Sequence, residues 1–316
     1  MRGRRGGVVR SWVALVAVVV VGVVLDGGGT VTLPAAAETT PATEARLESS
    51  SDSAAACTLS PTSGTVRRGI GSRWYRLHVP SGLTGPNARL IVALHGWIQP
   101  AENFETSSGL SQYADAGAKF IVAYPEGTYV PPVPEWLQAP GWEFTRSTSP
   151  DLTFLRAVVA DISATWCVDP RRVHAHGYSM GGLMSQRLAC EAPDVFASVS
   201  GYAVNDVERW WFDELESDPC TLSRPRSVLL SCGRLDANTD EGCEPARDAW
   251  DARLACPSPT SVTVPYGEYW RHSPCNGGSG LVWRTWTDLG HEYPTGAMAT
   301  RLHDEMNLFF AAYPRP

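Results

Sequence analysis

The sequence has almost no lysine and only a small excess of charge. Lys119 is the single lysine among 316 residues, and the formal net charge is −7. Proteins that bind nucleic acid or an anionic membrane surface by electrostatics need clustered basic side chains. We therefore expect no nucleic-acid partner. The hydrophobic fraction of 43% is sufficient for the core of one large α/β domain or of two small ones.

Closely spaced cysteine pairs are also absent. None of the eight cysteines forms a C-x-x-C pair, the spacing that is typical of zinc sites and redox motifs. Their even number favours up to four structural disulfides in an oxidising compartment. We predict one pairing, Cys256 with Cys275, because these residues flank one short insertion. No metal and no organic cofactor are expected. The cysteines are Cys57, Cys167, Cys190, Cys220, Cys232, Cys243, Cys256 and Cys275.

The N-terminus has an apolar run that is short for a membrane span. Residues 12–25 are almost wholly apolar, follow four arginines and precede a run of small residues at 35–37. This order is typical of a secretory signal peptide, whereas a membrane-spanning helix needs about 20 apolar residues. An uncleaved anchor is the alternative, and a lipoprotein is disfavoured because Cys57 lies far downstream. We predict a signal peptide at 1–37, a secreted protein, and no membrane contact after cleavage.

Large apolar residues are nearly absent from the next segment. Residues 38–56 are rich in Ser, Thr, Ala and Glu, so they cannot offset the entropy cost of becoming ordered. We interpret this segment as a disordered linker and expect a single folded domain at 57–316.

Within that domain, short β-branched runs alternate with longer segments of helical period. This order is typical of a mostly parallel sheet with helices on both faces. A helix is expected after Ser149-Pro150-Asp151, which supplies an N-cap, a first-turn proline and a first-turn acid. Others are expected from Met180 to about Cys190 and at the C-terminus. The expected strands lie in 74–80, 89–96, 120–127, 172–179, 197–203, 227–234 and 281–290.

The sharpest motif is Gly177-Tyr178-Ser179-Met180-Gly181, which fits G-x-S-x-G and lies between an expected strand and an expected helix. The turn between them has to be so tight that small residues flank the serine, whose hydroxyl is then exposed at the carboxyl edge of the sheet. The motif predicts Ser179 as a nucleophile.

A serine hydroxyl needs a base, and the base needs an acid that fixes its tautomer. In a fold of this kind the acid and then the histidine follow the serine, each after a later strand. Asp236 and His291 stand at such positions, although Asp240 and Glu241 are alternatives to Asp236. We expect structural roles for His78, His174, His176, His272 and His303, and a loop-shaping role for His95.

The oxyanion of an acyl-transfer intermediate needs backbone N–H donors, usually from the residue after the nucleophile and from the loop after the third strand. Met180 and Trp97 occupy these positions. The Trp97 side chain could also be a hydrophobic plug, since only its backbone is required.

The segment 90–294 resembles the esterase family of polyhydroxybutyrate depolymerases and feruloyl or acetylxylan esterases. The similarity lies in LHGWIQPAENF, in WCVDPRRVHAHGYSMGGLMSQRLAC and in GHEYP, which is similar to the family's GH-x-WP. It implies the α/β-hydrolase fold, a triad of Ser179, Asp236 and His291, and a G-x-x-D run ending at Asp236. The chain departs from the family in ANTDEGCEP after the acid and in Trp97, where a cysteine is common, so the substrate pocket is expected to be reshaped.

Aromatic side chains predict where a substrate could bind. Several tryptophans fall in expected loops over the carboxyl edge of the sheet, where flat rings could stack on a sugar, a phenolic acid or a polyester. Ordinary loop packing is the alternative for each of them. The Pro-rich loop 128–150 is a candidate pocket wall. The candidate substrate contacts are Trp142, Trp136, Tyr178 and Trp210, and further loop aromatics are Phe144, Trp211 and Trp270.

Together these patterns predict a secreted, monomeric serine esterase that acts through an acyl-enzyme. The resemblance implies feruloyl or acetyl esters of plant polysaccharide, or polyhydroxyalkanoate-type polyesters, as substrates. Alternatives are an exported acyltransferase with the same triad, and a hydrolase fold without catalysis that serves binding. The resemblance disfavours a peptidase.

Overall fold

A computed structural model describes residues 63–84, 87–131, 139–208, 217–237 and 243–316. These residues belong to one compact unit, Asp52–Pro316. The expected signal peptide and linker lie outside the described residues, as do Cys57, Trp136, Trp210 and Trp211. Within the part of the chain that is described, none of the helices combines the length and the apolar composition that a membrane crossing requires.

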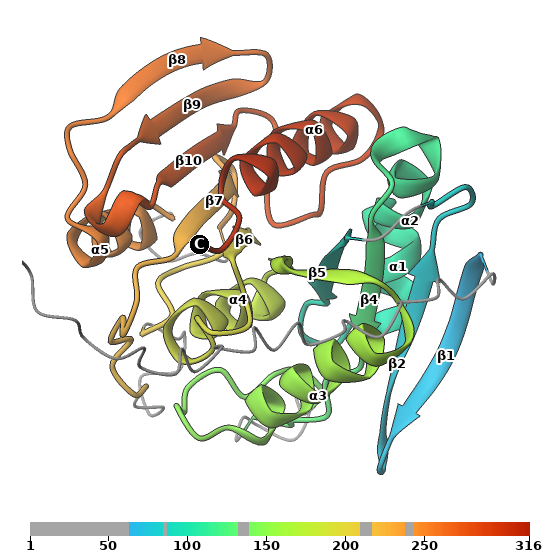
Figure 1. The fold of residues 1–316 in the computed structure, drawn as a ribbon. Coiled ribbons are helices and arrows are strands. Elements are labelled where there is room, and N and C mark those ends of the chain that lie inside the picture. Colours follow the sequence, from blue (N-terminus) through green and yellow to red (C-terminus); the bar gives the residue numbers. More distant parts are fainter. Residues whose placement is uncertain (1–62, 85–86, 132–138, 209–216, 238–242) are drawn as a thin grey trace, which may run out of the picture. The chain divides into compact units, whose positions relative to one another are not determined.

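The described strands form one ten-stranded sheet in the order β1-β2-β4-β3-β5-β6-β7-β10-β9-β8 (Figure 1). The six strands from β4 to β10 in that order are parallel, and antiparallel pairs close both ends. The strands are β1 Gly64–Ile70, β2 Arg73–Val79, β3 Ala88–Leu94, β4 Ile121–Pro125, β5 Val168–Tyr178, β6 Ser198–Tyr202, β7 Ser227–Gly233, β8 Thr260–Val264, β9 Gly267–His272 and β10 Leu281–Trp286.

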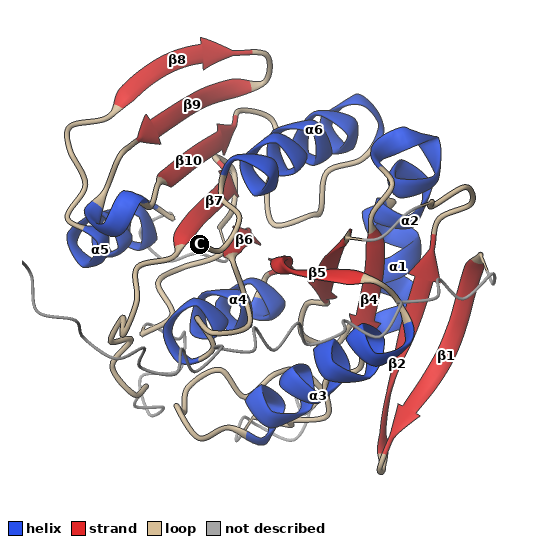
Figure 2. Ribbon diagram, in the orientation of Figure 1, coloured by secondary structure: helices blue, strands red, loops and turns tan. Residues whose placement is uncertain are grey.

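Helices cover both faces of this sheet (Figure 2). Apolar residues of α3, α4 and α5 share one core cluster with one face, and those of α1, α2 and α6 share a second cluster with the other face. The expected mostly parallel sheet with helices on both faces is therefore confirmed. The helices are α1 Ala101–Ser108, α2 Leu110–Tyr113, α3 Pro150–Thr165, α4 Met180–Glu191, α5 Glu244–Leu254 and α6 Gly296–Ala312, with short turns at Ala114–Ala118 and Asn276–Gly278.

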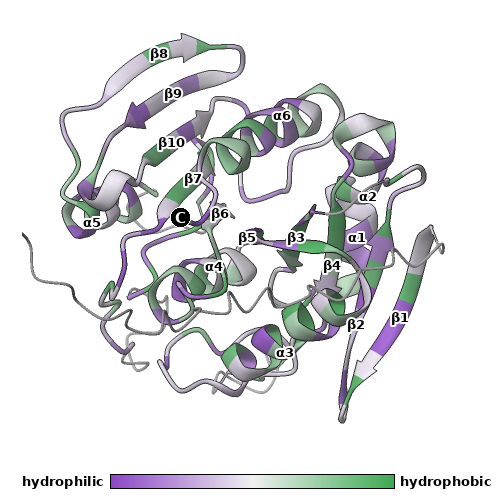
Figure 3. Cartoon of the chain, in the orientation of Figure 1, coloured by the Kyte–Doolittle hydropathy of each residue, from purple (hydrophilic) through white to green (hydrophobic). Residues whose placement is uncertain are grey.

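The central strands are buried on both faces, which explains their continuous apolar sequences. In β3, Leu90, Val92 and Leu94 belong to the first cluster, whereas Ile91 and Ala93 belong to the second. Figure 3 shows the contrast, since β3 and β4 are mainly green and β1 carries purple segments. Such runs are expected for parallel strands between two helical layers.

All seven expected strands are present, and the expected N-cap of α3 is confirmed. The Ser149 hydroxyl accepts a hydrogen bond from the N–H of Asp151 at 3.1 Å. Strict alternation of strands and helices is wrong at both ends of the sheet, where the β1–β2 and β8–β9 hairpins lie. β8 was missed although four of its five residues are β-branched, because they are mostly exposed and form no continuous apolar run. Trp270 was expected in a loop and lies instead on β9.

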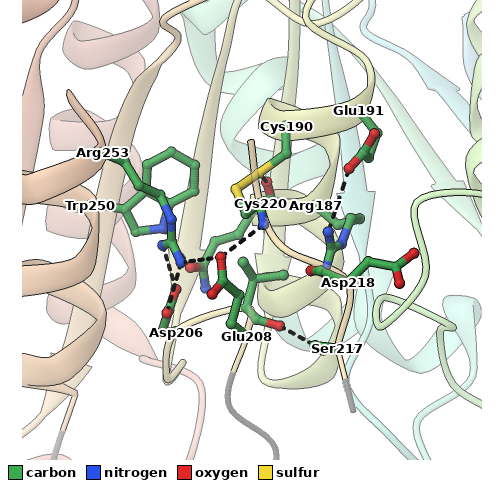
Figure 4. The surroundings of a disulfide bond; sticks show 12 residues. Arg187, Cys190, Glu191, Asp206, Glu208, Ser217, Asp218, Cys220, Trp250 and Arg253 are labelled. Carbon is green, nitrogen blue, oxygen red and sulfur yellow. Dashed lines mark hydrogen bonds and ion pairs between the residues drawn. A yellow bond between two sulfur atoms is a disulfide. The ribbon is translucent and has the colours of Figure 1, made fainter. Parts of the chain in front are cut away.

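Three disulfides join described cysteines, and Cys167 is also disulfide-bonded. The predicted pair Cys256–Cys275 is confirmed, and it brackets the β8–β9 hairpin. The Cys190–Cys220 disulfide lies in a polar network (Figure 4). In this network Glu208 accepts hydrogen bonds from the backbone N–H of Cys220 and from Arg253 on α5, and the disulfide joins Cys220 to Cys190 on α4. The third pair is Cys232–Cys243.

Candidate active site

The turn between β5 and α4 holds Ser179 in a strained backbone conformation. Its φ is 51° and its ψ is −123°, a combination that residues other than glycine rarely adopt. The flanking glycines make this turn possible. A Cβ atom at Gly177 would lie 2.0 Å from the carbonyl oxygen of Gly181. The turn therefore places the Ser179 hydroxyl at the carboxyl edge of the sheet, as the motif predicts.

A chain of short contacts joins the three residues that the sequence singled out. His291 Nε2 lies 2.8 Å from Ser179 Oγ, and His291 Nδ1 lies 2.9 and 3.0 Å from the two carboxylate oxygens of Asp236. A carboxylate only accepts hydrogen bonds, so the imidazole proton belongs on Nδ1. Nε2 is then free of its proton and can accept the hydroxyl proton of Ser179.

Two loops from neighbouring strands hold the acid and the histidine together. The N–H of Leu235 donates to the carbonyl of Leu289 at 2.9 Å, and a Cβ atom at Gly233 would lie 2.1 Å from that same carbonyl oxygen. The Asp236 side chain is fully buried, whereas 20% of the His291 side chain is exposed. The acid is thus shielded from water, and the histidine stays accessible to a substrate.

Within the described residues, two groups of closely spaced acidic, cysteine or histidine side chains have the composition of a metal site. One joins Asp236 with Cys232 and Cys243, and the other joins Asp251 with Cys256 and His272. In both clusters the sulfur atoms are bound in disulfides, so they are not thiolate ligands. In the first cluster, the sulfur atoms of the Cys232–Cys243 disulfide lie within 4.8 Å of a carboxylate oxygen of Asp236.

The two residues predicted to supply oxyanion donors both adjoin Gly141. A Cβ atom there would lie 2.3 Å from Met180 Sδ and 3.3 Å from Trp97 Cδ1. Met180 is the first residue of α4, so its N–H lies in the helix turn that has no intrahelical acceptor. The Trp97 ring is half-buried, packs against the core, and donates to the carbonyl of Ala139 at 2.9 Å. These contacts agree with the interpretation of the Trp97 side chain as a hydrophobic plug. That its backbone N–H is an oxyanion donor remains a prediction.

His95 shapes the loop that carries Trp97. Its Nδ1 donates to the carbonyl of Gly96 at 2.8 Å, and its Nε2 accepts from the N–H of Gly127 at 2.9 Å. Burial lowers the pKa of His95 to about 4. The imidazole is therefore neutral at neutral pH and bridges two loops, in agreement with the expected loop-shaping role.

The candidate substrate contacts differ in their surroundings. The Trp142 ring is fully buried and donates to the carbonyl of His95 at 2.9 Å, so the expectation that it contacts a substrate is wrong in this structure. Phe144 is also buried. Tyr178 is half-buried, with its ring centroid 5.5 Å from that of His291. Trp136 and Trp210 lie outside the described residues.

Sequence reasoning gave no role to Tyr293 and only a structural role to His176. The Tyr293 hydroxyl lies 2.8 Å from His176 Nε2, which connects the loop after His291 to the strand before Ser179. The position of Tyr293 two residues after the histidine, inside GHEYP, was a signal that could have drawn attention to it.

Comparison with known proteins gives consistent matches. A family model described as "Putative esterase" matches residues 73–255, which is more than half of the chain. "Putative esterase NocK" of Nocardia uniformis subsp. tsuyamanensis is 39% identical over 141 residues, which cover 42% of this chain and 38% of the relative. "Feruloyl esterase B" of Piromyces equi is 31% identical over 50% of this chain and 28% of its own length.

A third relative is "Poly(3-hydroxyalkanoate) depolymerase C" of Paucimonas lemoignei, 37% identical over 40% of this chain and 30% of its own length. The chain thus spans well under half the length of these relatives. Among solved structures, an acetyl xylan esterase from Aspergillus awamori shares the fold, with a TM-score of 0.62, 14% identity, and coverage of 79% of this chain and 99% of that one. An S-formylglutathione hydrolase from Agrobacterium tumefaciens has a TM-score of 0.57 at 16% identity, with coverage of 81% of this chain and 98% of that one. The chain has the α/β-hydrolase fold and belongs to the esterase family.

Proposed function

We propose that this protein hydrolyses carboxylic esters through a covalent acyl-enzyme on Ser179. The observation that carries the proposal is the chain of contacts from Ser179 Oγ through His291 to the buried carboxylate of Asp236. A serine hydroxyl is a weak nucleophile until a base accepts its proton, and these distances are within the reach of such a transfer.

In the first half-reaction, His291 Nε2 accepts the Ser179 proton while Oγ attacks the ester carbonyl. The N–H groups of Met180 and Trp97 would hold the oxyanion of the tetrahedral intermediate. The intermediate collapses when the alkoxy group leaves and takes the proton from His291. Water then attacks the acyl-enzyme in the same way, with its proton passing through His291, and releases the carboxylic acid and free Ser179.

Asp236 would orient the imidazole and stabilise the imidazolium that forms in each half-reaction. Its buried carboxylate contacts His291 with both oxygens and keeps the Nδ1 proton in place. The electrostatic stabilisation is strongest where water is excluded, which suits the full burial of the acid.

For the substrate, we propose feruloyl or acetyl esters of plant polysaccharide, or polyhydroxyalkanoate-type polyesters. Among these classes, the names of the relatives support feruloyl esters and poly(3-hydroxyalkanoates). Two exposed apolar side chains next to the predicted site residues also support a substrate with apolar parts. Ile98 follows Trp97 and is 61% exposed, and Leu235 precedes Asp236 and is 66% exposed. We further propose that the chain is exported and acts outside the cell, which the disulfides support.

The test compares purified wild type with Ser179→Ala on p-nitrophenyl butyrate, methyl ferulate, acetylated xylan and a polyhydroxybutyrate film. We expect hydrolysis by the wild type and a loss of at least about 1000-fold in kcat for Ser179→Ala, because the nucleophile is removed. The preferred substrate then identifies the class.

Ser163→Ala is the matched control, because Ser163 is an exposed serine on α3. It should hydrolyse at the wild-type rate and react with a fluorophosphonate label, whereas Ser179→Ala should not. A folded wild type that neither hydrolyses any of these esters nor takes the label would contradict the proposal.

A further inference from the structure

We propose that Tyr293 is a positioning residue whose hydroxyl, through His176, fixes the loop of the general base to the strand of the nucleophile. This inference rests on the proposed function. The Tyr293 hydroxyl lies 2.8 Å from His176 Nε2, although the two residues are 117 positions apart in the sequence. The contact between His291 Nε2 and Ser179 Oγ, also 2.8 Å long, joins the same loop to the turn that follows the same strand.

The two partners are placed close to the reacting groups by the chain itself. Tyr293 follows His291 by two residues, and His176 precedes Ser179 by three residues on β5. A fixed distance between Tyr293 and His176 therefore limits how far His291 can move from Ser179. The contact acts on geometry, since neither partner touches the Ser179 hydroxyl in the described hydrogen bonds.

His176 is itself held in one orientation. It pairs with Ser200 in the β5–β6 register, and its Nδ1 lies 3.2 Å from the Ser200 hydroxyl. A phenol is a good hydrogen-bond donor, so the consistent arrangement has the Tyr293 hydroxyl donating to Nε2 and Nδ1–H donating to Ser200. His176 and Ser200 are both fully buried.

The protonation state supports a permanent contact. Burial, with a smaller effect of His303, lowers the pKa of His176 to about 3. Burial also raises the pKa of Tyr293 well above its usual value. A neutral imidazole acceptor and a neutral phenol donor therefore persist at neutral pH.

Aromatic packing and the hydroxyl contribute separately to the position of Tyr293. Its ring packs edge-on against Phe104 and Tyr178, with centroids 5.5 and 5.7 Å away, and it lies 5.6 Å from the ring of Tyr202. Phenylalanine keeps these ring contacts and removes only the hydroxyl. Tyr293→Phe therefore isolates the hydrogen bond from the packing.

The experiment measures kcat and KM separately, and the rate of fluorophosphonate labelling of Ser179, in Tyr293→Phe. We expect kcat and the labelling rate to fall about tenfold with an unchanged KM, because a small displacement of a catalytic base weakens catalysis more than binding. A loss of stability alone would leave kcat of the folded enzyme unchanged.

Tyr124→Phe is the matched control. Tyr124 is also fully buried on the same face of the sheet, and its hydroxyl lies 2.9 Å from that of Ser111, on α2. This variant removes one buried hydroxyl contact that does not involve the His291 loop. It should lose similar thermal stability and keep the wild-type kcat.

A double-mutant cycle with His176→Leu identifies the route of the effect. If the hydroxyl acts through His176, the loss in kcat for the double variant will equal that of either single variant rather than their product. His176→Gln keeps an acceptor and should recover part of the rate lost in His176→Leu.

The outcomes separate this proposal from the proposed function. An inactive Ser179→Ala together with a Tyr293→Phe that has wild-type kcat and labelling rate would overturn the positioning role alone. Multiplicative losses in the cycle would overturn the route through His176. An active Ser179→Ala would overturn both the function and this inference.

Discussion

A Cβ atom at Gly181 would lie 2.2 Å from the carbonyl oxygen of Leu94. This approach brings the first turn of α4 against the end of β3, just before the loop that carries Trp97. The distance is too short for any residue with a side chain, and the atom it would meet belongs to the backbone, which cannot rotate away.

Gly181→Ala should therefore separate α4 from the end of β3. We expect a loss of about 2 kcal/mol in the free energy of unfolding and a fall in kcat of about 100-fold. Chemical denaturation and ester hydrolysis measure the two effects. Gly69→Ala, where the new Cβ atom has 3.8 Å to its nearest neighbour, is the control. Equal behaviour of the two variants would refute the steric explanation.

The Cys232–Cys243 disulfide should support the position of Asp236. The double variant Cys232→Ala/Cys243→Ala is expected to lose about 3 kcal/mol of stability and also to have a lower kcat, because the disulfide lies beside the carboxylate. Removing Cys256 and Cys275 in the same way serves as the comparison, since that disulfide brackets the β8–β9 hairpin. It should lose stability and retain kcat. A wild-type kcat in the first variant, measured while it is folded, would contradict this prediction.

Stability should fall as the pH decreases from neutral. Burial lowers the pKa of His95 and His303 to about 4, and that of His176 to about 3, from an unfolded value of 6.5. The unfolded chain thus binds more protons than the folded chain below pH 6.5, so the stability present above that pH is lost as the pH falls toward the folded pKa values. Each of these three histidines should lower the free energy of unfolding by about 1 kcal/mol between pH 7.5 and 5.5.

Urea unfolding at several pH values measures this dependence. His303→Gln, which replaces a titrating ring by a neutral amide, should have a smaller slope of stability against pH than the wild type. An identical slope would show that His303 does not contribute.

Ile98→Gly should raise stability and weaken binding of apolar esters. Ile98 has a φ of 67°, a conformation that a β-branched residue adopts only with strain of about 1 to 3 kcal/mol. We propose that its exposed side chain contacts the apolar part of the substrate, so its loss should raise KM about fivefold. Ala255→Gly is the control, because Ala255 has a φ of 45° at the end of α5. It should gain stability without a change in KM, and an unchanged KM in Ile98→Gly would argue against substrate contact.

Local sequence was sufficient to predict the central strands and the turn at Ser179, whereas His291 and Asp236 were predicted from their order after later strands and from the family resemblance. The buried strands have continuous apolar runs, and α3 begins at a serine cap followed by proline and acid, which are all signals within a few residues. Gly177 and Gly181, which flank Ser179, likewise predict the tight turn from neighbouring positions in the sequence.

The outer strands could not be predicted in this way. β1 and β8 are mostly exposed and have no continuous apolar run, and each pairs with a neighbouring strand that offers hydrogen-bond partners. Trp142 is similar, since its residue type suited a substrate-binding loop and only its packing beside His95 and Met180 buries it.

The sequence by itself determined the central strands and the nucleophile turn, because each depends on neighbours along the chain, and it named Asp236 and His291 as candidate acid and base by their order after later strands. Only the tertiary structure decided that Tyr293 contacts His176, that a disulfide lies beside Asp236, and that Trp142 is buried. These contacts join residues far apart in the sequence, and their hydrogen bonds and packing exist only after the sheet and its loops have come together.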